Sequence, residues 1–308
     1  MLRVFVAPRG TRDFLRDAVV DGGGVVVDDV SAADALVWTA PNDPAGLRRL
    51  LAENPRLSWV QLPWAGIEGY LDVLDGRRLW TAGQGVYADD VAEHALAFML
   101  AGLRDFKKRA TATSWSAPSG RSLHNAVVTV FGAGGITRGL VPLLAPFRPR
   151  LRVVRRKAEP FDAAPPVSDV ALFGFDDREN AVRGADVVVL ALALTPETRR
   201  CIGARELAAM QSTTLVVNVA RGGHIDTDAL VDALDRGVIG GACLDVTDPE
   251  PLPAGHRLWS MDNVLITPHC ANTPAMAVPV LTQRVRENVR RRIAGDALLG
   301  VVDVNAGY

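Results

Sequence analysis

The chain has 308 residues, of which 48% are hydrophobic and 22% charged, as is ordinary for a globular protein with a sizeable core. Its formal net charge of −1 excludes the strong basic field of many proteins that bind nucleic acid or anionic membranes. Its apolar stretches are too short to span a bilayer, and its three cysteines lack the spacing of a disulfide framework or a zinc site. We therefore expect no nucleic-acid partner, no membrane partner and no metal.

The first predicted element is an apolar strand at residues 3–7, and no signal-peptide pattern precedes it, so we expect a cytoplasmic protein. Further apolar runs of strand length follow at 24–27, 35–38, 58–61, 127–131, 151–154, 187–192, 215–219, 241–244 and 264–266. Several of them are near-continuous runs of Val, Ile and Leu, which is typical of parallel strands covered by helices on both faces.

Helical patterns lie between these runs. The clearest is residues 227–235, which follow Asp226 and end before Gly237. Longer helices are predicted at 90–110 and 277–293, and a polar loop at 111–125. The alternation of strands and helices predicts an α/β fold with doubly wound parallel sheets.

The strand at 127–131 runs into residues 132–137, Gly-Ala-Gly-Gly-Ile-Thr. A strand, a tight glycine turn and a helix start are the context of a dinucleotide-binding fingerprint. Gly132 allows the turn, and Gly134 lets backbone N–H groups approach a pyrophosphate. Thr137 replaces the usual third glycine, so we expect a different packing of helix on strand. Glycine turns are common in α/β proteins, so the prediction of a dinucleotide site rests on the position of this turn directly after a buried strand.

The next strand, 151–154, ends in Arg155 and Arg156. An acidic residue at this distance past the glycines holds the ribose 2′-hydroxyl of NAD, whereas an arginine accommodates the 2′-phosphate of NADP. The two arginines therefore favour NADP(H), with NAD(H) kept as possible and a solvated basic turn as the alternative without a ligand.

Three residues whose side chains can take part in catalysis follow successive predicted strands. Arg221 lies on a turn beside two glycines, Glu250 in a proline-rich loop, and His269 directly after a proline. Each residue alone is as readily a surface or structural residue. Ligands of open α/β sheets bind outside the carboxyl ends of the strands, so the three are expected to converge there.

Reduction of a carbonyl requires such a set. Transfer of hydride to the carbonyl carbon leaves negative charge on the oxygen, which a histidine can protonate near neutral pH. A carboxylate beside that histidine favours its protonated form, and an arginine can hold a substrate carboxylate. The sequence therefore predicts that Arg221, Glu250 and His269 are the catalytic residues of a nicotinamide-dependent reductase.

The sequence resembles the D-isomer-specific 2-hydroxyacid dehydrogenases over essentially the whole chain. The most specific matches are residues 217–223, 244–252 and 267–271, in the family's order, and residues 91–94 and 185–199 also match. The resemblance implies that Arg221 binds substrate, Glu250 tunes the histidine and His269 is the acid/base. The cofactor residues expected from these motifs are Gly132, Gly134, Gly135, Ile136, Arg155, Arg156, Leu192, Val219, Ala220, Asp245 and Ala271. The expected substrate residues are Ala65, Gly66, Ile67, Arg221 and His269.

The resemblance also implies two Rossmann-like domains, with a substrate domain that is discontinuous in sequence. Residues 1–98 plus 277–308 are expected to form this flavodoxin-like substrate domain, and residues 99–276 the NAD(P)-binding domain. Family members are usually homodimers, and Trp115 lies in the loop that some members extend toward the partner's active site.

Length and the basic cofactor strand resemble the glyoxylate/hydroxypyruvate reductase branch, although Trp64 leaves a bulkier 2-keto acid open. Departures from the family pattern are Thr137, Arg155, Ala191 and Ala193. One alternative is a nucleotide-sensing binding protein or corepressor on the same fold. Another is an enzyme like D-3-phosphoglycerate dehydrogenase, which we expect less because the regulated members carry a long C-terminal extension that is not seen in this sequence. Glu250 argues against a formate dehydrogenase, where a glutamine stands at this position.

Overall fold

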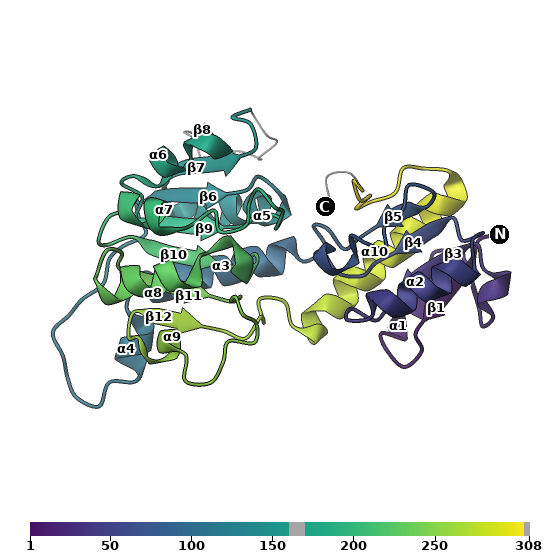
Figure 1. The fold of residues 1–308 in the computed structure, drawn as a ribbon, viewed down its shortest axis with the longest axis horizontal. Coiled ribbons are helices and arrows are strands. Elements are labelled where there is room, and N and C mark those ends of the chain that lie inside the picture. Colours follow the sequence, from purple (N-terminus) through teal and green to yellow (C-terminus); the bar gives the residue numbers. More distant parts are fainter. Residues whose placement is uncertain (160–169, 305–308) are drawn as a thin grey trace. The chain divides into compact units, whose positions relative to one another are not determined.

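The computed structural model describes residues 1–159 and 170–304. The chain divides into two compact units (Figure 1). Unit 1 comprises Met1–Tyr87 and the C-terminal segment from Thr273, and unit 2 comprises Ala88–Asn272. The expected boundary between residues 98 and 99 falls inside one continuous helix, α3 (Ala88–Leu103), which lies entirely within unit 2.

Unit 1 contains a five-stranded parallel sheet in the order β2-β1-β3-β4-β5. Helices α1 and α10 cover one face, over Val4, Val6 and Val37, and α2 covers the other, over Leu36 and Val60. Its elements are β1 (Arg3–Ala7), α1 (Phe14–Asp21), β2 (Val25–Val27), η1 (Val30–Ala32), β3 (Ala35–Trp38), α2 (Pro44–Glu53), β4 (Trp59–Gln61), η2 (Glu68–Tyr70), β5 (Leu79–Thr81) and α10 (Pro274–Ala294).

Unit 2 contains a seven-stranded parallel sheet in the order β12-β11-β10-β9-β6-β7-β8 (Figure 1). Its elements after α3 are α4 (Phe106–Ala110), β6 (Val127–Phe131), α5 (Gly135–Leu144), η3 (Ala145–Phe147), β7 (Arg150–Arg155), β8 (Val170–Gly174), η4 (Phe175–Asp177), α6 (Arg178–Val182), β9 (Val187–Leu190), α7 (Ala204–Ala209), β10 (Leu215–Asn218), η5 (Gly222–His224), α8 (Thr227–Asp235), β11 (Gly241–Leu244), α9 (Arg257–Ser260) and β12 (Val264–Ile266).

Two apolar layers explain why the strands of unit 2 read as unbroken hydrophobic runs. Val188, Val216 and Ala242 pack under α6, α7 and α8, whereas the alternate residues Val187 and Val217 pack under α3 and α5. Both faces of each strand are therefore buried, as in a doubly wound sheet. This confirms the fold class expected from the sequence.

The helix boundaries follow local chemistry. The Asp226 side chain accepts from the N–H of Ala229 and caps α8, and Thr273 caps α10 in the same way. The single helix predicted at 90–110 was wrong, because Asp105 has a φ of 51° and interrupts it between α3 and α4. Strands β5 and β8, which lie at the edges of their sheets, were also not predicted.

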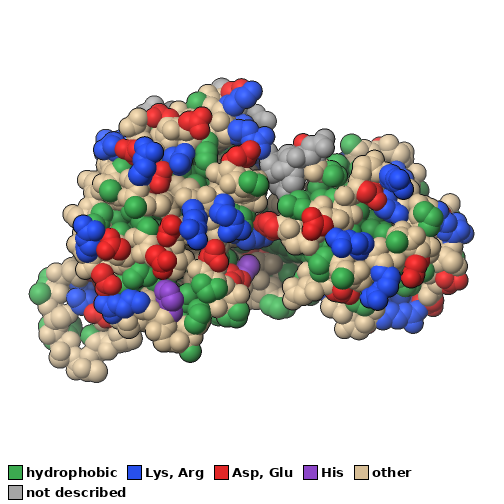
Figure 2. Space-filling view, in the orientation of Figure 1, with side chains coloured by type: hydrophobic (Ala, Val, Ile, Leu, Met, Phe, Trp, Pro, Cys, Tyr) green, Lys and Arg blue, Asp and Glu red, His purple; other side chains and the backbone are tan. Residues whose placement is uncertain are grey.

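Basic and acidic side chains are interspersed over the face drawn in Figure 2. Among residues 1–159 and 170–304, no helix is both long enough and apolar enough to cross a membrane. The same residues contain no group of three or more His, Cys, Asp or Glu side chains arranged to hold a metal ion.

Candidate active site

The glycine loop follows β6 at the point where the strand order of unit 2 reverses. From β6 the chain continues to β7 and β8 on one side and to β9, β10, β11 and β12 on the other. A Cβ on Gly132 would lie 2.3 Å from the carbonyl oxygen of Ala191, and Gly132 has a φ of 104°. Only glycine therefore fits this turn between the ends of β6 and β9, which is where dinucleotides bind in such sheets.

The space beside Gly134 fits a phosphate group. A Cβ on Gly134 would meet no heavy atom within 4 Å, and this residue is the N-cap of α5 and provides no capping side chain. The first N–H groups of the helix are therefore open to an anion. The Thr137 side chain is fully buried and donates a hydrogen bond of 2.9 Å to the Gly132 carbonyl, so it replaces the third glycine by bonding back to the turn.

The two basic residues lie at the carboxyl end of β7, next to the glycine loop. Phe131 pairs with Val154, so Arg155 stands beside Gly132 across the strand pair. A guanidinium nitrogen of Arg155 donates to the carbonyl of Glu159 at 2.7 Å, which orders the turn after the strand. Arg156 is exposed. Both positions fit the expected place of a ribose substituent.

Arg221 follows β10 on a turn that its neighbours hold. The buried Asn218 side chain donates to the Arg221 carbonyl at 2.9 Å and accepts from the N–H of Ala220 at 3.1 Å. A guanidinium nitrogen of Arg221 donates to the Ala220 carbonyl at 2.7 Å. Asn218 was not singled out in the sequence, although a polar residue at the end of an apolar strand was a usable signal.

Gly222 brings the Arg221 turn against the loop that carries Glu250. A Cβ on Gly222 would lie 1.9 Å from the carbonyl oxygen of Thr247. No side chain fits between these two backbones, so a glycine at this position is required for the approach.

We expect Gly222→Ala to destabilise the protein by about 1–3 kcal/mol, because the added methyl group must push two backbone segments apart. Denaturant unfolding measures this loss. Gly174→Ala is the matched control, since a Cβ at Gly174 would meet no heavy atom within 4 Å. Equal stabilities of the two variants would contradict the close approach.

A buried carboxylate organises the segment that carries His269. Asp245 is 2% exposed and accepts from the Thr267 hydroxyl at 2.5 Å, the Cys270 N–H at 2.8 Å and the Ala271 N–H at 3.0 Å. The His94 ring lies 3.2 Å from the same hydroxyl, through Nε2. Both carboxylate oxygens of Asp245 therefore already accept hydrogen bonds from the protein. The roles of Thr267 and His94 in this network were not predicted.

His269 and Glu250, separated by 19 residues, form a direct pair. Nδ1 of His269 lies 2.6 Å from Oε1 of Glu250, and both side chains are about half exposed. The N–H of His269 donates to the Asp245 carbonyl at 2.8 Å, and its backbone has a φ of 51°. Such left-handed backbone is uncommon for a residue other than glycine and clusters at functional sites. The pairing aims Nε2 away from Glu250.

The strand register places these residues at one edge of the sheet. Asn218, Leu244 and Ile266 are aligned across β10, β11 and β12, and the Arg221, Glu250 and His269 segments follow them. The other expected cofactor residues also lie after strands of unit 2; Val219, Ala220 and Ala271 are buried and Leu192 is partly exposed.

The expected carboxylate loop belongs to unit 1. Ala65 and Gly66 are partly exposed and Ile67 is buried, between β4 and η2. The Trp64 ring lies 5.1 Å from that of Tyr70. In unit 2, Trp115 lies fully exposed in the loop after α4.

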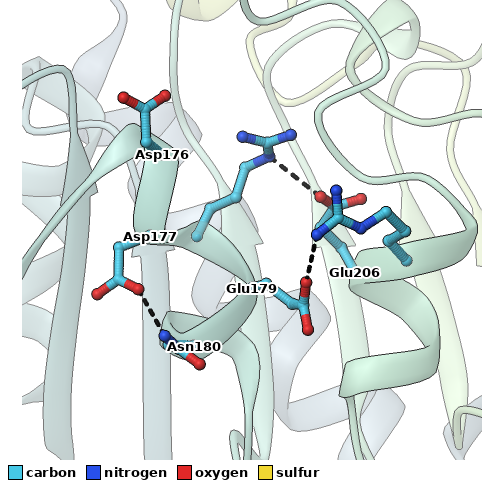
Figure 3. A pocket seen from close by; sticks show the side chains of 7 residues that line it. Asp176, Asp177, Glu179, Asn180 and Glu206 are labelled. Atoms are coloured by element: carbon cyan, nitrogen blue, oxygen red, sulfur yellow. Dashed lines mark hydrogen bonds and ion pairs between the residues drawn. The ribbon is translucent and has the colours of Figure 1, made fainter.

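A separate recess of about 240 Å³ lies on η4, α6 and α7 (Figure 3). Four of its charged side chains pair with one another: Arg178 with Glu206 at 3.1 Å, and Arg205 with Glu179 at 2.8 Å. None of the predicted site residues lines it. We therefore place the chemistry at the carboxyl edge of the sheet and not in this recess.

Comparison with known proteins matches residues 94–271 to the model of the D-isomer specific 2-hydroxyacid dehydrogenase NAD binding domain. A Corynebacterium melassecola protein described as uncharacterized is 39% identical over 302 residues, 94% of this chain and 95% of that protein. Glyoxylate/hydroxypyruvate reductase A of Photorhabdus laumondii is 28% identical over 296 residues, 91% of this chain and 89% of its own length.

Solved structures extend the similarity to both units. A D-isomer specific 2-hydroxyacid dehydrogenase from Xanthobacter autotrophicus in complex with NADPH has a TM-score of 0.84 at 28% identity, covering 100% of this chain and 99% of its own. The NADPH-dependent glyoxylate/hydroxypyruvate reductase from Sinorhizobium meliloti, in complex with NADP and sulfate, has a TM-score of 0.82 at 25% identity and covers 100% of both chains. This chain belongs to the D-isomer specific 2-hydroxyacid dehydrogenase family.

Proposed function

We propose that the protein is an NADPH-dependent reductase of 2-keto acids, of the glyoxylate/hydroxypyruvate type. As a member of its family it is an NAD(P)-dependent oxidoreductase that acts on the CH–OH group of D-2-hydroxy acids. The observation that carries the proposal is the pair between His269 Nδ1 and Glu250 Oε1, at 2.6 Å, beside the Arg221 turn on the sheet that bears the glycine loop.

We assign the catalytic roles as follows, and the pairing of His269 with Glu250 supports them. Nδ1 of His269 donates its hydrogen to Glu250, so Nε2 is the atom that delivers a proton to the keto oxygen as negative charge develops there. Arg221 holds the substrate carboxylate and polarises the keto oxygen through its fork of N–H groups. When bound, the nicotinamide of the cofactor would supply the hydride. In the reverse direction the same Nε2 accepts the proton of the hydroxy acid.

We assign cofactor binding to unit 2 and part of substrate binding to unit 1. Gly132, Gly134 and the first turn of α5 would hold the pyrophosphate. The substrate contact expected of residues 65–67, in unit 1, stays a prediction. Homodimer formation and a cytoplasmic location stay predictions.

A panel of initial rates tests the function. Purified protein receives NADPH or NADH with glyoxylate, hydroxypyruvate, a phosphorylated 3-carbon 2-keto acid and larger 2-keto acids. Turnover with the small 2-keto acids is expected, and the panel also tests the bulkier substrates left open by Trp64. Absence of turnover with every pair, together with tight nucleotide binding, would favour the sensor or corepressor alternative. Turnover confined to a phosphorylated 3-carbon substrate would favour the phosphoglycerate dehydrogenase alternative.

We expect Arg155→Ala to lower kcat/KM for NADPH by about tenfold or more, with a much smaller effect on NADH, because only NADPH carries the 2′-phosphate. Steady-state kinetics with each cofactor measure the ratio. Arg150→Ala is the matched control, since Arg150 is an exposed arginine at the opposite end of the same strand, β7. A wild-type protein that prefers NADH would remove the assignment of both Arg155 and Arg156.

A further inference from the structure

His224, the last residue of η5, is a fully buried histidine directly after the Arg221 turn. Its Nδ1 lies 3.0 Å from the carbonyl oxygen of Arg221, and its Nε2 lies 3.2 Å from the carbonyl oxygen of Ala193. Ala193 belongs to the loop that follows β9, so one imidazole ring joins two strand-end loops. The proposed hydride transfer does not use this ring.

Both ring nitrogens therefore face hydrogen-bond acceptors. A neutral imidazole carries one N–H, so it can donate to only one of the two carbonyls, and its second nitrogen turns a lone pair toward the other. The imidazolium carries two N–H groups and satisfies both contacts. In a buried position, an acceptor that faces a lone pair is destabilising, so the two contacts favour the protonated ring, whereas burial itself favours the neutral ring.

The backbone around the ring is fixed from several sides. The His224 carbonyl accepts from the N–H of Ile202 at 3.0 Å and lies 3.6 Å from the Cys201 thiol. Burial raises the pKa of Cys201 to about 12, so this thiol stays a neutral donor. The backbone that carries the ring is therefore held in place, and full burial leaves the ring little room to turn away from the two carbonyls.

Charged groups on the neighbouring segments also influence the ring. Arg221 precedes it on the same turn, and a guanidinium nitrogen of Arg199 lies 3.3 Å from the position of a Cβ on Gly223. Both cations oppose an imidazolium. Two carboxylates lie on segments next to this turn: Asp226 follows η5, and Asp248 lies on the loop after β11 whose Thr247 carbonyl meets Gly222. Both carboxylates also form ion pairs with arginines, Asp226 with Arg200 at 3.5 Å and Asp248 with Arg199 at 3.7 Å.

We propose that His224 is a positioning residue for Arg221. As an imidazolium it holds the Arg221 carbonyl and the Ala193 carbonyl together and so presets the turn that presents the guanidinium to an anionic substrate. Loss of the proton releases one of the two hydrogen bonds and loosens the turn. Substrate binding through Arg221 then weakens as the pH rises through the titration of His224. This inference rests on the proposed function, in which Arg221 binds the substrate carboxylate.

The test compares wild-type protein with His224→Asn and His224→Phe. Asparagine can donate to one carbonyl, whereas phenylalanine keeps a ring but donates to neither. His124→Gln is the control, because His124 is an exposed histidine of the same unit. KM and kcat for glyoxylate with NADPH are measured from about pH 5.5 to 8.5, the range of histidine titration. NMR of the labelled histidine rings follows the protonation of His224 in wild-type protein over the same range.

In wild-type protein we expect KM for glyoxylate to rise about tenfold as His224 loses its proton, as for the loss of one buried hydrogen bond. The phenylalanine variant should have a high KM throughout and keep only the part of this rise that His269 contributes, with asparagine intermediate and NADPH affinity unchanged in both. Thermal unfolding shows whether each variant is folded. If the His224→Phe variant does not fold, the His224→Asn variant and the titration of wild-type protein still test the proposal.

Two results would overturn the proposal: a His224 ring that stays neutral at every pH, or a KM in folded variants that follows the wild-type pH profile. Failure of the proposed function looks different, because wild-type protein then turns over no 2-keto acid. In that case the ring titration and the hydrogen exchange of residues 218–226 still show whether His224 holds the Arg221 and Ala193 carbonyls together. Faster exchange in the phenylalanine variant supports it, and unchanged exchange contradicts it.

Discussion

Replacement of His269 by alanine is expected to lower kcat for the reduction of a 2-keto acid by about 10²- to 10⁴-fold, the usual contribution of a positioned general acid. The dissociation constant of NADPH should stay within about twofold, because the proton donor contributes to the chemical step and not to nucleotide binding. Single-turnover kinetics and fluorescence titration with NADPH measure the two quantities separately. An unchanged kcat would remove His269 from the acid/base role.

Glu250→Gln supplies the companion measurement. Glutamine keeps an oxygen near Nδ1 of His269, 2.6 Å from the carboxylate in the structure, but it removes the negative charge. We expect a smaller loss than for His269→Ala, because the imidazolium loses stabilisation while the proton donor itself remains. The double variant should be little worse than His269→Ala alone, since residues that act as one unit are not additive. Additive losses would show that the two residues act independently. His124→Gln again serves as the surface control.

Replacement of Arg221 by alanine is expected to lower kcat/KM for 2-keto acids by about 10²- to 10³-fold or more, as for the loss of a donor aimed at developing negative charge. Arg221→Lys should recover only part of this loss, because an ammonium group lacks the planar fork that matches a carboxylate. Steady-state kinetics with glyoxylate measure both variants, and titration with NADPH checks that the cofactor site is intact.

The matched control for Arg221 is Arg236→Ala, at an exposed arginine that forms an ion pair with Asp232 of α8. We expect its kinetics to match those of wild-type protein. If Arg221→Ala behaved like this control, the substrate carboxylate would be bound elsewhere and the inference about His224 would fail with it.

Much of the fold was predictable because both faces of the parallel strands are buried. The runs at 127–131 and 241–244 match β6 and β11, and the helix at 227–235 matches α8, whose Asp226 cap is a local signal. Two features that escaped prediction have different causes, one a pairing and one a local backbone conformation. Strand β8 exists through its pairing with β7, and the break between α3 and α4 depends on one left-handed residue, Asp105.

For the candidate active site, the residue types and their positions after strands could be predicted from the sequence. Arg221, Glu250 and His269 could be named because the carboxyl ends of parallel strands meet at one edge. Only the tertiary structure shows that Glu250 meets Nδ1 of His269 and that Gly222 lies against Thr247. His224 carried no signal at all in the sequence, because a histidine's role depends on which atoms face its two nitrogens. Composition and periodicity determine which faces are buried, whereas hydrogen-bond partners separated by many residues are decided by the path of the folded backbone.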